Sequence, residues 1–186
     1  MRSVFSNDLV KIRRHELVDV PLLFDAARES IADVSRWLPW CHPRYSIEES
    51  LEWVLKCQKA WDEGLEYSFA IFDGHTEAFA GGVGLNQLDR FHRVANLGYW
   101  VRTGCTGRSL ATAAARLAAN FGFEELGLTR IEITAAVENK ASRRVAEKLG
   151  ALREGVLRKR LVINDQSQDV VIHSLLAEEW DSSIPS

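Results

Sequence analysis

The spacing of apolar residues predicts strands and helices in turn over the first 85 residues. Strict alternation of apolar and polar positions is typical of a half-buried strand, and apolar residues three and four apart are typical of a helix with one buried face. The pattern indicates a strand, two helices and then two antiparallel strands. Their expected bounds are Leu9–Ile12, a helix capped by Asp19 with Pro21 in its first turn, Ser46 to about Glu63, Tyr67–Phe72, and Ala78–Leu85.

Local signals place the ends of these elements. The segment from Trp37 to Pro43 contains two prolines and therefore breaks regular structure between the helices. Ser46 and Glu49 have the spacing of a capping box, which opens the second helix. The Asp73-Gly74-His75 turn joins the two strands as a hairpin. An aromatic connection thus links the helices, and a tight turn links the strands.

The rest of the chain continues the alternation without a linker, repeat or low-complexity segment. We therefore expect one domain over residues 1–186, with a core from about 9 to 180. The fold class is α/β of the α+β kind, with a mixed, mostly antiparallel twisted sheet flanked by helices. The later elements are expected at Ala95–Val101, a turn Arg102–Arg108 and a helix to about Phe123, Arg130–Val137, Asn139–Leu149 stopped by Gly150, Ala151–Val156, and Val170–Leu176.

Composition narrows the classes of partner. The 186 residues are 46% hydrophobic and 26% charged, and the net charge of -3 provides no basic field for nucleic acid or an anionic membrane. The odd number of cysteines and the absence of a CxxC pair indicate reduced thiols, and no signal peptide or membrane span is evident. The histidines are too scattered for a metal site. We expect a cytoplasmic protein with no metal.

A strand-to-helix junction has the composition of an anion site. Small residues cluster between Val101 and Thr112, and free N–H groups of a first helical turn bind phosphate where side chains leave room. We expect a helix beginning near Gly107, with Gly107 and Ser109 leaving the approach open and Arg108 adding a cation. The segment matches neither GxxxxGK[ST] nor GxGxxG. On this segment alone, an ordinary strand–helix turn with Gly and Thr as caps is an equally good interpretation.

Several separate segments together resemble one known family. Over about Leu9 to Trp180, and in the family's order, the chain is similar to the GCN5-related N-acetyltransferases, and within them to the RimJ/RimL-like group, which includes enzymes acetylating ribosomal-protein N-termini. The resemblance implies the family's fold, a V-shaped opening between two central strands, and acetyl-CoA as donor. The segments are Arg36–Trp40, Ser46–Ser50, Leu97–Val101, Asn139–Ser142, Lys148–Gly155, and Asp169 through Ser174-Leu175-Leu176 to Glu178-Glu179-Trp180.

Two positions depart from the family's pattern. The pyrophosphate loop of the family usually reads Gln or Arg, two residues, Gly, one residue, then Gly or Ala. In the run from Thr106 to Ala111, Thr106 replaces the long polar residue and Ser109 stands in place of a glycine. We expect Ser109 to adopt helical geometry and to present its N–H. Asn96 stands where many relatives carry glutamate, so that carboxylate's work falls to another residue or to water.

The resemblance also implies residues for the donor side. The acetyl group passes directly from acetyl-CoA to a primary amine in a ternary complex, with a backbone N–H around Trp100 to Arg102 polarising the carbonyl. Ser142, one turn after Asn139, is the candidate acid that protonates the thiolate. The alternative is that Asn139 only caps its helix and Ser142 satisfies a first-turn donor. The expected donor-binding residues are Trp100, Val101, Arg102, Thr106, Gly107, Arg108, Ser109, Leu110, Ala111, Thr112, Asn139 and Ser142.

For the acceptor side, the sequence leaves several alternatives for the binding residues, the general base and the acceptor itself. Trp40 and Tyr45 lie in the segment that resembles the border of the acceptor cleft, although aromatic residues more often form core. Glu66, Asp89 and His92 are candidates for the general base, Asp89 and His92 also for substrate contact, and a solvated surface role is the alternative for each. The acceptor is a protein N-terminal amine or a small amine such as an amino acid, polyamine or drug. A domain that binds acyl-CoA without turnover is the other class, and a monomer or homodimer is expected.

Overall fold

The computed structural model describes residues 2–181, which are built around an eight-stranded sheet in the order β1-β2-β3-β4-β5-β6-β8-β7. Every neighbouring pair is antiparallel except β5 with β6, which is parallel. This confirms the predicted fold class. The strands are β1 (Val4–Ser6), β2 (Val10–Arg14), β3 (Tyr67–Asp73), β4 (Phe79–Asp89), β5 (Val94–Val101), β6 (Arg130–Ala136), β7 (Leu152–Ile163) and β8 (Gln166–Leu176).

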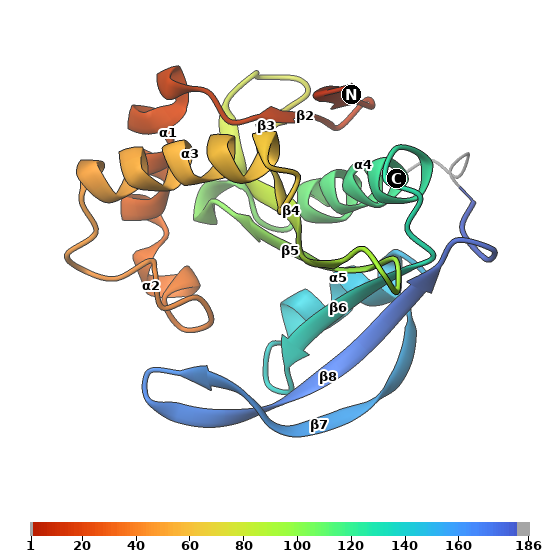
Figure 1. The fold of residues 1–186 in the computed structure, drawn as a ribbon. Coiled ribbons are helices and arrows are strands. Elements are labelled where there is room, and N and C mark those ends of the chain that lie inside the picture. The colour runs from red at the N-terminus through yellow and green to blue at the C-terminus, as the bar shows by residue number, and fades with distance from the viewer. Residues whose placement is uncertain (1, 182–186) are drawn as a thin grey trace.

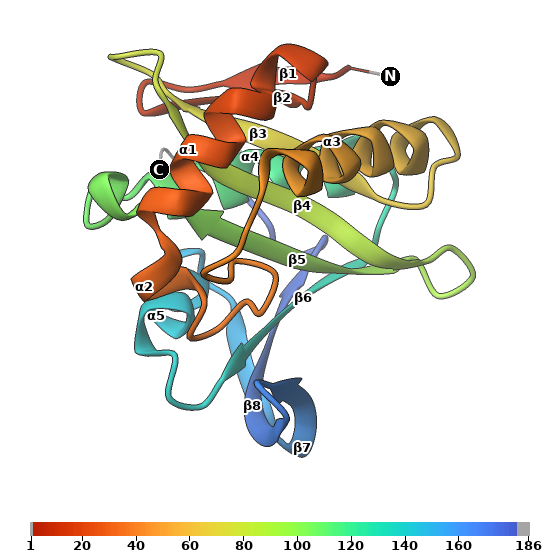
Figure 2. The ribbon, with the colours of Figure 1, turned by 90° about the vertical axis from the view of Figure 1, so that its left-hand side faces the viewer.

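Helices cover both faces of the sheet, as Figures 1 and 2 show. Figure 2 shows α1 and α3 in front of β3–β5 and α4 behind them. The helices are α1 (Val20–Glu29), α2 (Ile31–Val34), α3 (Ile47–Asp62), α4 (Leu110–Glu124) and α5 (Lys140–Lys148), with short 3-10 turns at Leu17–Asp19 and Thr103–Cys105.

The larger core lies between α4 and the sheet. Phe69, Leu97 and Ile131 are almost fully buried there against the alanine-rich face of α4. Since successive strand residues point to opposite faces, Asn96 and Trp100 of β5 face the α1 and α3 side. Trp100 packs there against a second, smaller core. The two faces of β5 therefore serve different purposes, one packing the core and the other meeting a more open layer.

The central parallel pair splits partway along its length. β5 pairs with β6 from Val94 to Asn96 on one strand and from Arg130 to Glu132 on the other, and the pairing ends there. The remaining length of β5, up to Val101, stays paired with β4 on its other edge. The edge of β5 that faces β6 is therefore unpaired beyond Asn96, as the V-shaped opening of the resemblance requires.

The sequence pattern located these elements except at the two edges of the sheet. We expected the first strand at Leu9–Ile12, but β1 precedes it and pairs with β2. We expected the last strands to be Ala151–Val156 and Val170–Leu176, but β7 and β8 form a longer hairpin. The second error has a clear cause: most β7 residues are exposed on both faces, so no buried positions mark the strand in the sequence.

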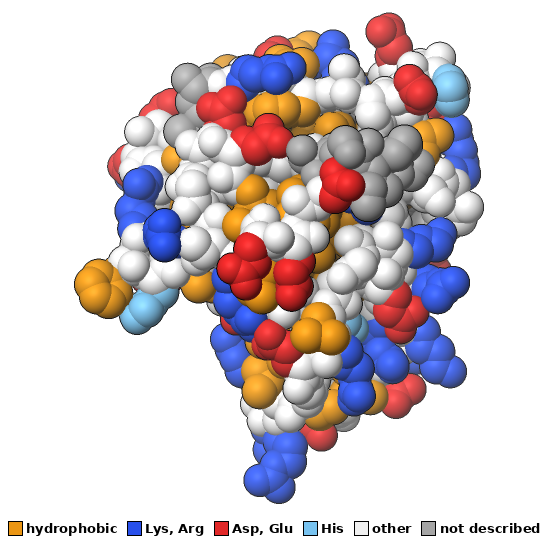
Figure 3. Space-filling model, turned by 90° about the vertical axis from the view of Figure 1, so that its right-hand side faces the viewer, with side chains coloured by type: hydrophobic (Ala, Val, Ile, Leu, Met, Phe, Trp, Pro, Cys, Tyr) orange, Lys and Arg blue, Asp and Glu red, His pale blue; other side chains and the backbone are white. Residues whose placement is uncertain are grey.

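Charge on this hairpin is mixed. The hairpin forms the lower part of the face in Figure 3, where basic side chains are interspersed with acidic and apolar ones. Leu152 and Val162 of β7 are among its exposed apolar side chains.

The N-terminal caps of α1 and α3 differ. Ser46 and Glu49 form the predicted capping box at the start of α3. Asp19 occupies the N-cap position of α1, but its side chain makes no cap hydrogen bond. Its buried carboxylate instead accepts hydrogen bonds from the Arg13 guanidinium at 2.6 and 2.8 Å and from the Glu16 N–H. The expected cap is therefore a link between β2 and α1.

Candidate active site

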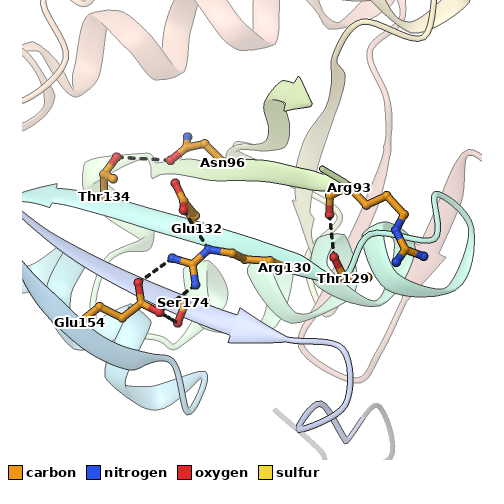
Figure 4. A network of polar contacts seen from close by, with 8 residues as sticks. All are labelled: Arg93, Asn96, Thr129, Arg130, Glu132, Thr134, Glu154 and Ser174. Atoms are coloured by element: carbon orange, nitrogen blue, oxygen red, sulfur yellow. Dashed lines mark hydrogen bonds and ion pairs between the residues drawn. The ribbon is translucent and has the colours of Figure 1, made fainter. Parts of the chain in front are cut away.

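Asn96 lies at the point where β5 and β6 separate. Its side-chain amide donates to the Asn86 side chain of β4 at 2.9 Å. It also accepts a hydrogen bond from the Thr134 hydroxyl of β6 at 3.2 Å (Figure 4). Glu132 is the residue of β6 paired with Asn96, and Figure 4 shows its carboxylate beside Asn96. The carboxylate of Glu132 on β6 thus lies beside the position where β5 carries Asn96. The two residues are far apart in the sequence, so the sequence alone did not show this.

A charged cluster holds β6, β7 and β8 together beside this point. Arg130 donates to Glu132 at 2.9 Å and binds both carboxylate oxygens of Glu154 at 2.6 and 2.7 Å (Figure 4). The Ser174 hydroxyl donates to Glu154 as well. Arg130 therefore sets the position of Glu132, because its guanidinium is fixed from the opposite side.

Acid should weaken the fold through Glu154. Hydrogen bonds from Arg130 and Ser174 lower the pKa of Glu154 from its usual 4.5 to about 2. Because the folded-state pKa lies below the unfolded value, this stabilisation is complete above the unfolded pKa and is lost as the pH falls through the folded one. We expect Glu154→Gln to lose less thermal stability than the parent between about pH 5 and about pH 3. Thermal melts at each pH measure this, with exposed Glu178→Gln as control; the same pH dependence in all three proteins would contradict the assignment.

The loop before α4 differs from the expected helix start. The helix begins at Leu110 rather than near Gly107, and Ser109 is its N-cap in the left-handed region with φ 60. The expectation of helical geometry at Ser109 was wrong, because the chain turns into the helix there. Gly107 is also left-handed, with φ +75, and an added Cβ would meet nothing within 4 Å. The free first-turn N–H groups are therefore those of Leu110, Ala111 and Thr112.

The charges around this loop also differ from expectation. Arg108 forms an ion pair with Asp73 at 2.6 Å, and the Asp73 side chain is fully buried. The hydrogen bond from the His75 N–H is the main cause of the lowered pKa of Asp73, and the Thr76 N–H and Arg108 lower it further. Arg108 is thus bound to the β3–β4 turn and is not a free cation over the loop. The Lys148 ammonium of α5 instead lies 3.4 Å from the Ser109 hydroxyl.

The loop is fastened to α1 at its other end. The Arg102 guanidinium donates to Glu29 at 2.6 Å, and the Gly104 N–H donates to the same carboxylate at 2.9 Å. The bond from Arg102 is the main cause of the lowered pKa of Glu29. The Thr106 hydroxyl donates back to the Thr103 carbonyl. Thr106 therefore stabilises the turn, and no long polar side chain extends from that position.

Backbone N–H directions along β5 alternate between β4 and the opening. The Arg102 N–H donates to the Ala80 carbonyl of β4 at 2.8 Å, so it is not available to a ligand. In an antiparallel ladder, the backbone N–H groups of residues two apart face the same neighbouring strand. The Trp100 N–H is therefore directed to β4 as well. The N–H groups that face the opening are those of Tyr99 and Val101. Of the expected range, Val101 is the residue whose N–H has the right direction.

Ser142 and Tyr99 meet across the opening. The Asn139 side chain caps α5 by accepting the Ser142 N–H at 3.1 Å, as the cap interpretation expected. The Ser142 hydroxyl is not used by that cap and lies 3.1 Å from the Tyr99 hydroxyl, which donates to the Ser142 carbonyl at 2.8 Å. Burial raises the pKa of Tyr99 to about 12. Sequence reasoning missed Tyr99, since its partner is 43 positions away.

A cavity of about 430 Å³ lies on the other side of β5, under α3. Trp40, Tyr45, Glu66 and Trp100 are among the residues that line it. The cavity ends near Asn86 and Gly98, next to the point where β5 and β6 separate. An amine held in it would therefore lie beside the unpaired edge of β5.

Asp89 and His92 do not line this cavity. They lie on the exposed turn between β4 and β5, where the His92 ring nitrogen is 2.7 Å from the Asp89 carboxylate. Hydrogen bonding by the His92 N–H is the main cause of the lowered pKa of Asp89. The pair is a local turn contact, and the structure does not bring it to the opening or to the cavity.

Two kinds of feature are absent from the part of the chain that the structure describes. Between residues 2 and 181, no group of three or more His, Cys, Asp or Glu side chains is arranged to hold a metal ion. Within the same range, no helix is long and apolar enough to span a membrane.

Comparisons with known proteins agree with this geometry. The family model described as acetyltransferase (GNAT) domain matches residues 10–152. The chain is 33% identical over 178 residues to the "Putative ribosomal N-acetyltransferase YdaF" of Bacillus subtilis, covering 94% of this chain and 95% of the relative. It is 30% identical over 145 residues to the spermidine N(1)-acetyltransferase of Escherichia coli, covering 73% and 76%.

Solved structures show the same fold. A crystal structure named as a probable acetyltransferase superposes with a TM-score of 0.88 at 30% identity, covering 95% of this chain and 98% of that one. RimL, a ribosomal L7/L12 α-N-protein acetyltransferase solved in complex with coenzyme A, has a TM-score of 0.86 at 20% identity, with coverage of 96% and 99%.

Proposed function

The chain belongs to the GNAT acetyltransferase family and is an N-acetyltransferase, and we propose that it moves an acetyl group from acetyl-CoA directly to a primary amine held in the cavity under α3. The observation that carries this proposal is the split between β5 and β6. It places an unpaired strand edge, a free helix N-terminus and the Ser142–Tyr99 pair around one opening, with the cavity adjoining it.

The donor side fits the shape and charge of a CoA thioester. The unpaired edge of β5 offers N–H groups to the pantetheine arm, and the Val101 N–H is directed at the position of the thioester carbonyl. The first-turn N–H groups of α4 and the dipole of that helix bind the pyrophosphate. Lys148 supplies the nearby cation in place of Arg108, since Asp73 holds Arg108. The open space around Gly107 leaves the phosphates room.

The Ser142–Tyr99 pair supplies the proton for the leaving thiolate. Tyr99 donates its one proton to the Ser142 carbonyl, so in the second contact the Ser142 hydroxyl is the donor. Ser142 gives its proton to the sulfur as the C–S bond breaks and regains one from solvent, while the proton that the acceptor nitrogen loses leaves through its base, so the protons balance. The raised pKa of Tyr99 keeps that phenol protonated at neutral pH. We therefore assign Ser142 as the acid and Tyr99 as its partner.

Two classes of acceptor remain, each with a specific relative. The relative YdaF is named as a ribosomal N-acetyltransferase, which favours a protein N-terminal α-amine. The second relative acts on spermidine by its name, which favours a small amine. Of the three candidate bases, Glu66 alone lines the cavity, and we assign it to bind the acceptor ammonium and accept its proton. The free thiols at Cys41, Cys57 and Cys105 fit the cytoplasmic setting that we propose.

The direct test is release of free thiol from acetyl-CoA with and without amines, followed by mass analysis of each amine. The proposal predicts acceptor-dependent thiol release and a mass increase of one acetyl group on the acceptor. Binding of acetyl-CoA with no acceptor-dependent release, across peptides and small amines, would show a non-catalytic acyl-CoA-binding domain instead.

Acetyl-CoA should raise the melting temperature of the protein. A ligand that binds only the folded state, at about 100 times its Kd, adds about 2.7 kcal/mol of apparent stability. Thermal melts in an acetyl-CoA series measure the shift, with adenosine as a control that lacks the pyrophosphate and the thioester. No shift at millimolar acetyl-CoA, together with no heat of binding, would rule out this donor.

A further inference from the structure

The cavity exists because glycines form its floor. Gly82 and Gly84 of β4 and Gly98 of β5 line it, on the face of the sheet that α3 covers. A Cβ added at Gly82 would lie 2.9 Å from the Trp100 indole nitrogen, and one at Gly84 would lie 2.9 Å from the Tyr67 carbonyl oxygen, so neither position has room for a side chain. At Gly98 an added Cβ would meet only the Asn86 and Asn96 amides, at 3.5 and 3.9 Å, which are ordinary contacts. The room above Gly98 is therefore free space that the fold itself does not need.

Aromatic side chains form the walls above this floor. Trp40, Tyr45, Trp53 and Trp100 all line the cavity. The Trp40 ring lies edge to face against Tyr45 and Trp100, with centroids 5.6 and 5.3 Å apart, so these rings hold each other in place. Trp40 and Trp53 nevertheless remain 37% and 41% exposed. Large apolar side chains left accessible around a cavity indicate an apolar partner.

The charges in the cavity favour a cation. Glu49 is engaged by the Ser46 N–H and by His42, but Glu66 is half-buried with no hydrogen bond or ion pair to its carboxylate among residues 2–181. Lys56 also lines the cavity and lies over the Trp53 ring.

His15 contributes no opposing charge. It also lines the cavity, and burial lowers its pKa to about 4, so the ring is neutral at pH 7. A primary ammonium beside Glu66 and the aromatic faces is therefore stabilised by the carboxylate and by cation–π contacts.

We propose that the acceptor is a compact primary amine bearing one bulky apolar group of about the size of an aromatic ring. This inference rests on the proposed function and names its substrate class. The glycine floor and aromatic walls receive the apolar group, while Glu66 binds the ammonium. A volume of about 430 Å³ is near the lower end for ligand pockets, which fits one such group. A polyamine would leave the aromatic walls without an apolar partner.

The test compares five acceptors with acetyl-CoA: 2-phenylethylamine, n-butylamine, spermidine and two tetrapeptides, one beginning with Phe and one with Ser. We expect kcat/KM for 2-phenylethylamine to exceed that of butylamine and spermidine by at least about tenfold, from burial of the ring. The peptide pair distinguishes a small free amine from a protein N-terminus as the acceptor. If the acceptor is a protein N-terminus, the Phe-peptide should be acetylated faster than both the Ser-peptide and 2-phenylethylamine.

Matched variants separate this inference from the proposed function. Gly98→Val fills the floor and should lower kcat/KM for 2-phenylethylamine at least about tenfold without changing the Kd of acetyl-CoA. Gly98→Ala, a smaller change, guards against misfolding, and exposed Glu124→Gln is the unchanged control. Quenching of tryptophan fluorescence by 2-phenylethylamine, lost in Gly98→Val, supports the site independently of turnover.

Each outcome bears on one of the two proposals. Preferential acetylation of spermidine or of the Ser-peptide would overturn the apolar acceptor while leaving the acetyltransferase intact. Failure of acetyl-CoA to bind would overturn the proposed function, and fluorescence quenching that Gly98→Val abolishes would still support an apolar amine site. Equal quenching in the parent and in Gly98→Val would overturn that site.

Discussion

Replacing Ser142 by alanine should lower kcat by roughly 10²–10⁴-fold, the range of a positioned acid, with the Kd of acetyl-CoA little changed. The reason is the geometry of its hydroxyl, which the helix cap does not use and which lies 3.1 Å from the Tyr99 hydroxyl. The cap of α5 is made by Asn139 to the Ser142 N–H, and alanine keeps that N–H. Stability should therefore change little while turnover falls. Steady-state kinetics, acetyl-CoA titration and a thermal melt on one preparation measure all three quantities.

Two further variants make this test specific. Tyr99→Phe removes the partner hydroxyl and should reduce kcat less than Ser142→Ala, because Ser142 remains to donate. Asn139→Ala removes the cap and should cost about 1 kcal/mol of stability with kcat per folded molecule near the parent value.

The pH dependence separates the acid role from a packing role. A thiolate leaves more easily without protonation as the pH rises, so the defect of Ser142→Ala should grow toward acid pH. A pH-independent loss of less than about threefold would remove Ser142 from the mechanism.

Placing a carboxylate at Gly107 should weaken acetyl-CoA binding by roughly 5- to 10³-fold. A unit charge about 4 Å from a phosphate costs about 1 kcal/mol in water and about 4 kcal/mol at a protein surface. The Gly107 Cβ would extend into open space, so Gly107→Asp meets no steric barrier. Its φ of +75 is unfavourable for any side chain, and some loss of stability is expected.

The chain offers a matched control for that strain. Gly127 follows α4, has φ +64, and an added Cβ there would likewise meet nothing within 4 Å. Gly127→Asp should therefore show a similar loss of stability with an unchanged Kd for acetyl-CoA. Calorimetric titration of both variants and the parent gives the comparison. Equal affinity in Gly107→Asp and the parent would show that the pyrophosphate lies elsewhere.

Parts of the site that depend on local chain chemistry were predictable. Asn139 caps its helix through a hydrogen bond to the Ser142 N–H. The two residues are three positions apart, so this cap depends only on the local sequence. The capping box at Ser46 formed for the same reason. Trp40 and Tyr45 line the cavity, as the resemblance implied for substrate contacts, while Asp89 and His92 do not. Asp89 and His92 form a hydrogen bond with each other on an exposed turn. The distance of that turn from the cavity depends on the whole fold, so the local sequence could not predict it.

Contacts between distant segments decided the rest. Arg108 was expected to face the phosphates, yet the buried carboxylate of Asp73 holds it, since a buried charge needs a partner. Ser109 was expected to be helical, yet it is left-handed where the chain turns into α4.

The sequence by itself determined the family and the order of the strands and helices from β2 onward, because periodicity and caps act over a few residues. Only the tertiary structure decided which N–H groups face the opening, that Tyr99 meets Ser142, and that three glycines leave a cavity under α3. Those features depend on the register of β4 with β5 and on where β5 leaves β6. Register and splitting are set by packing across the whole sheet, and no short segment of this chain carries that information.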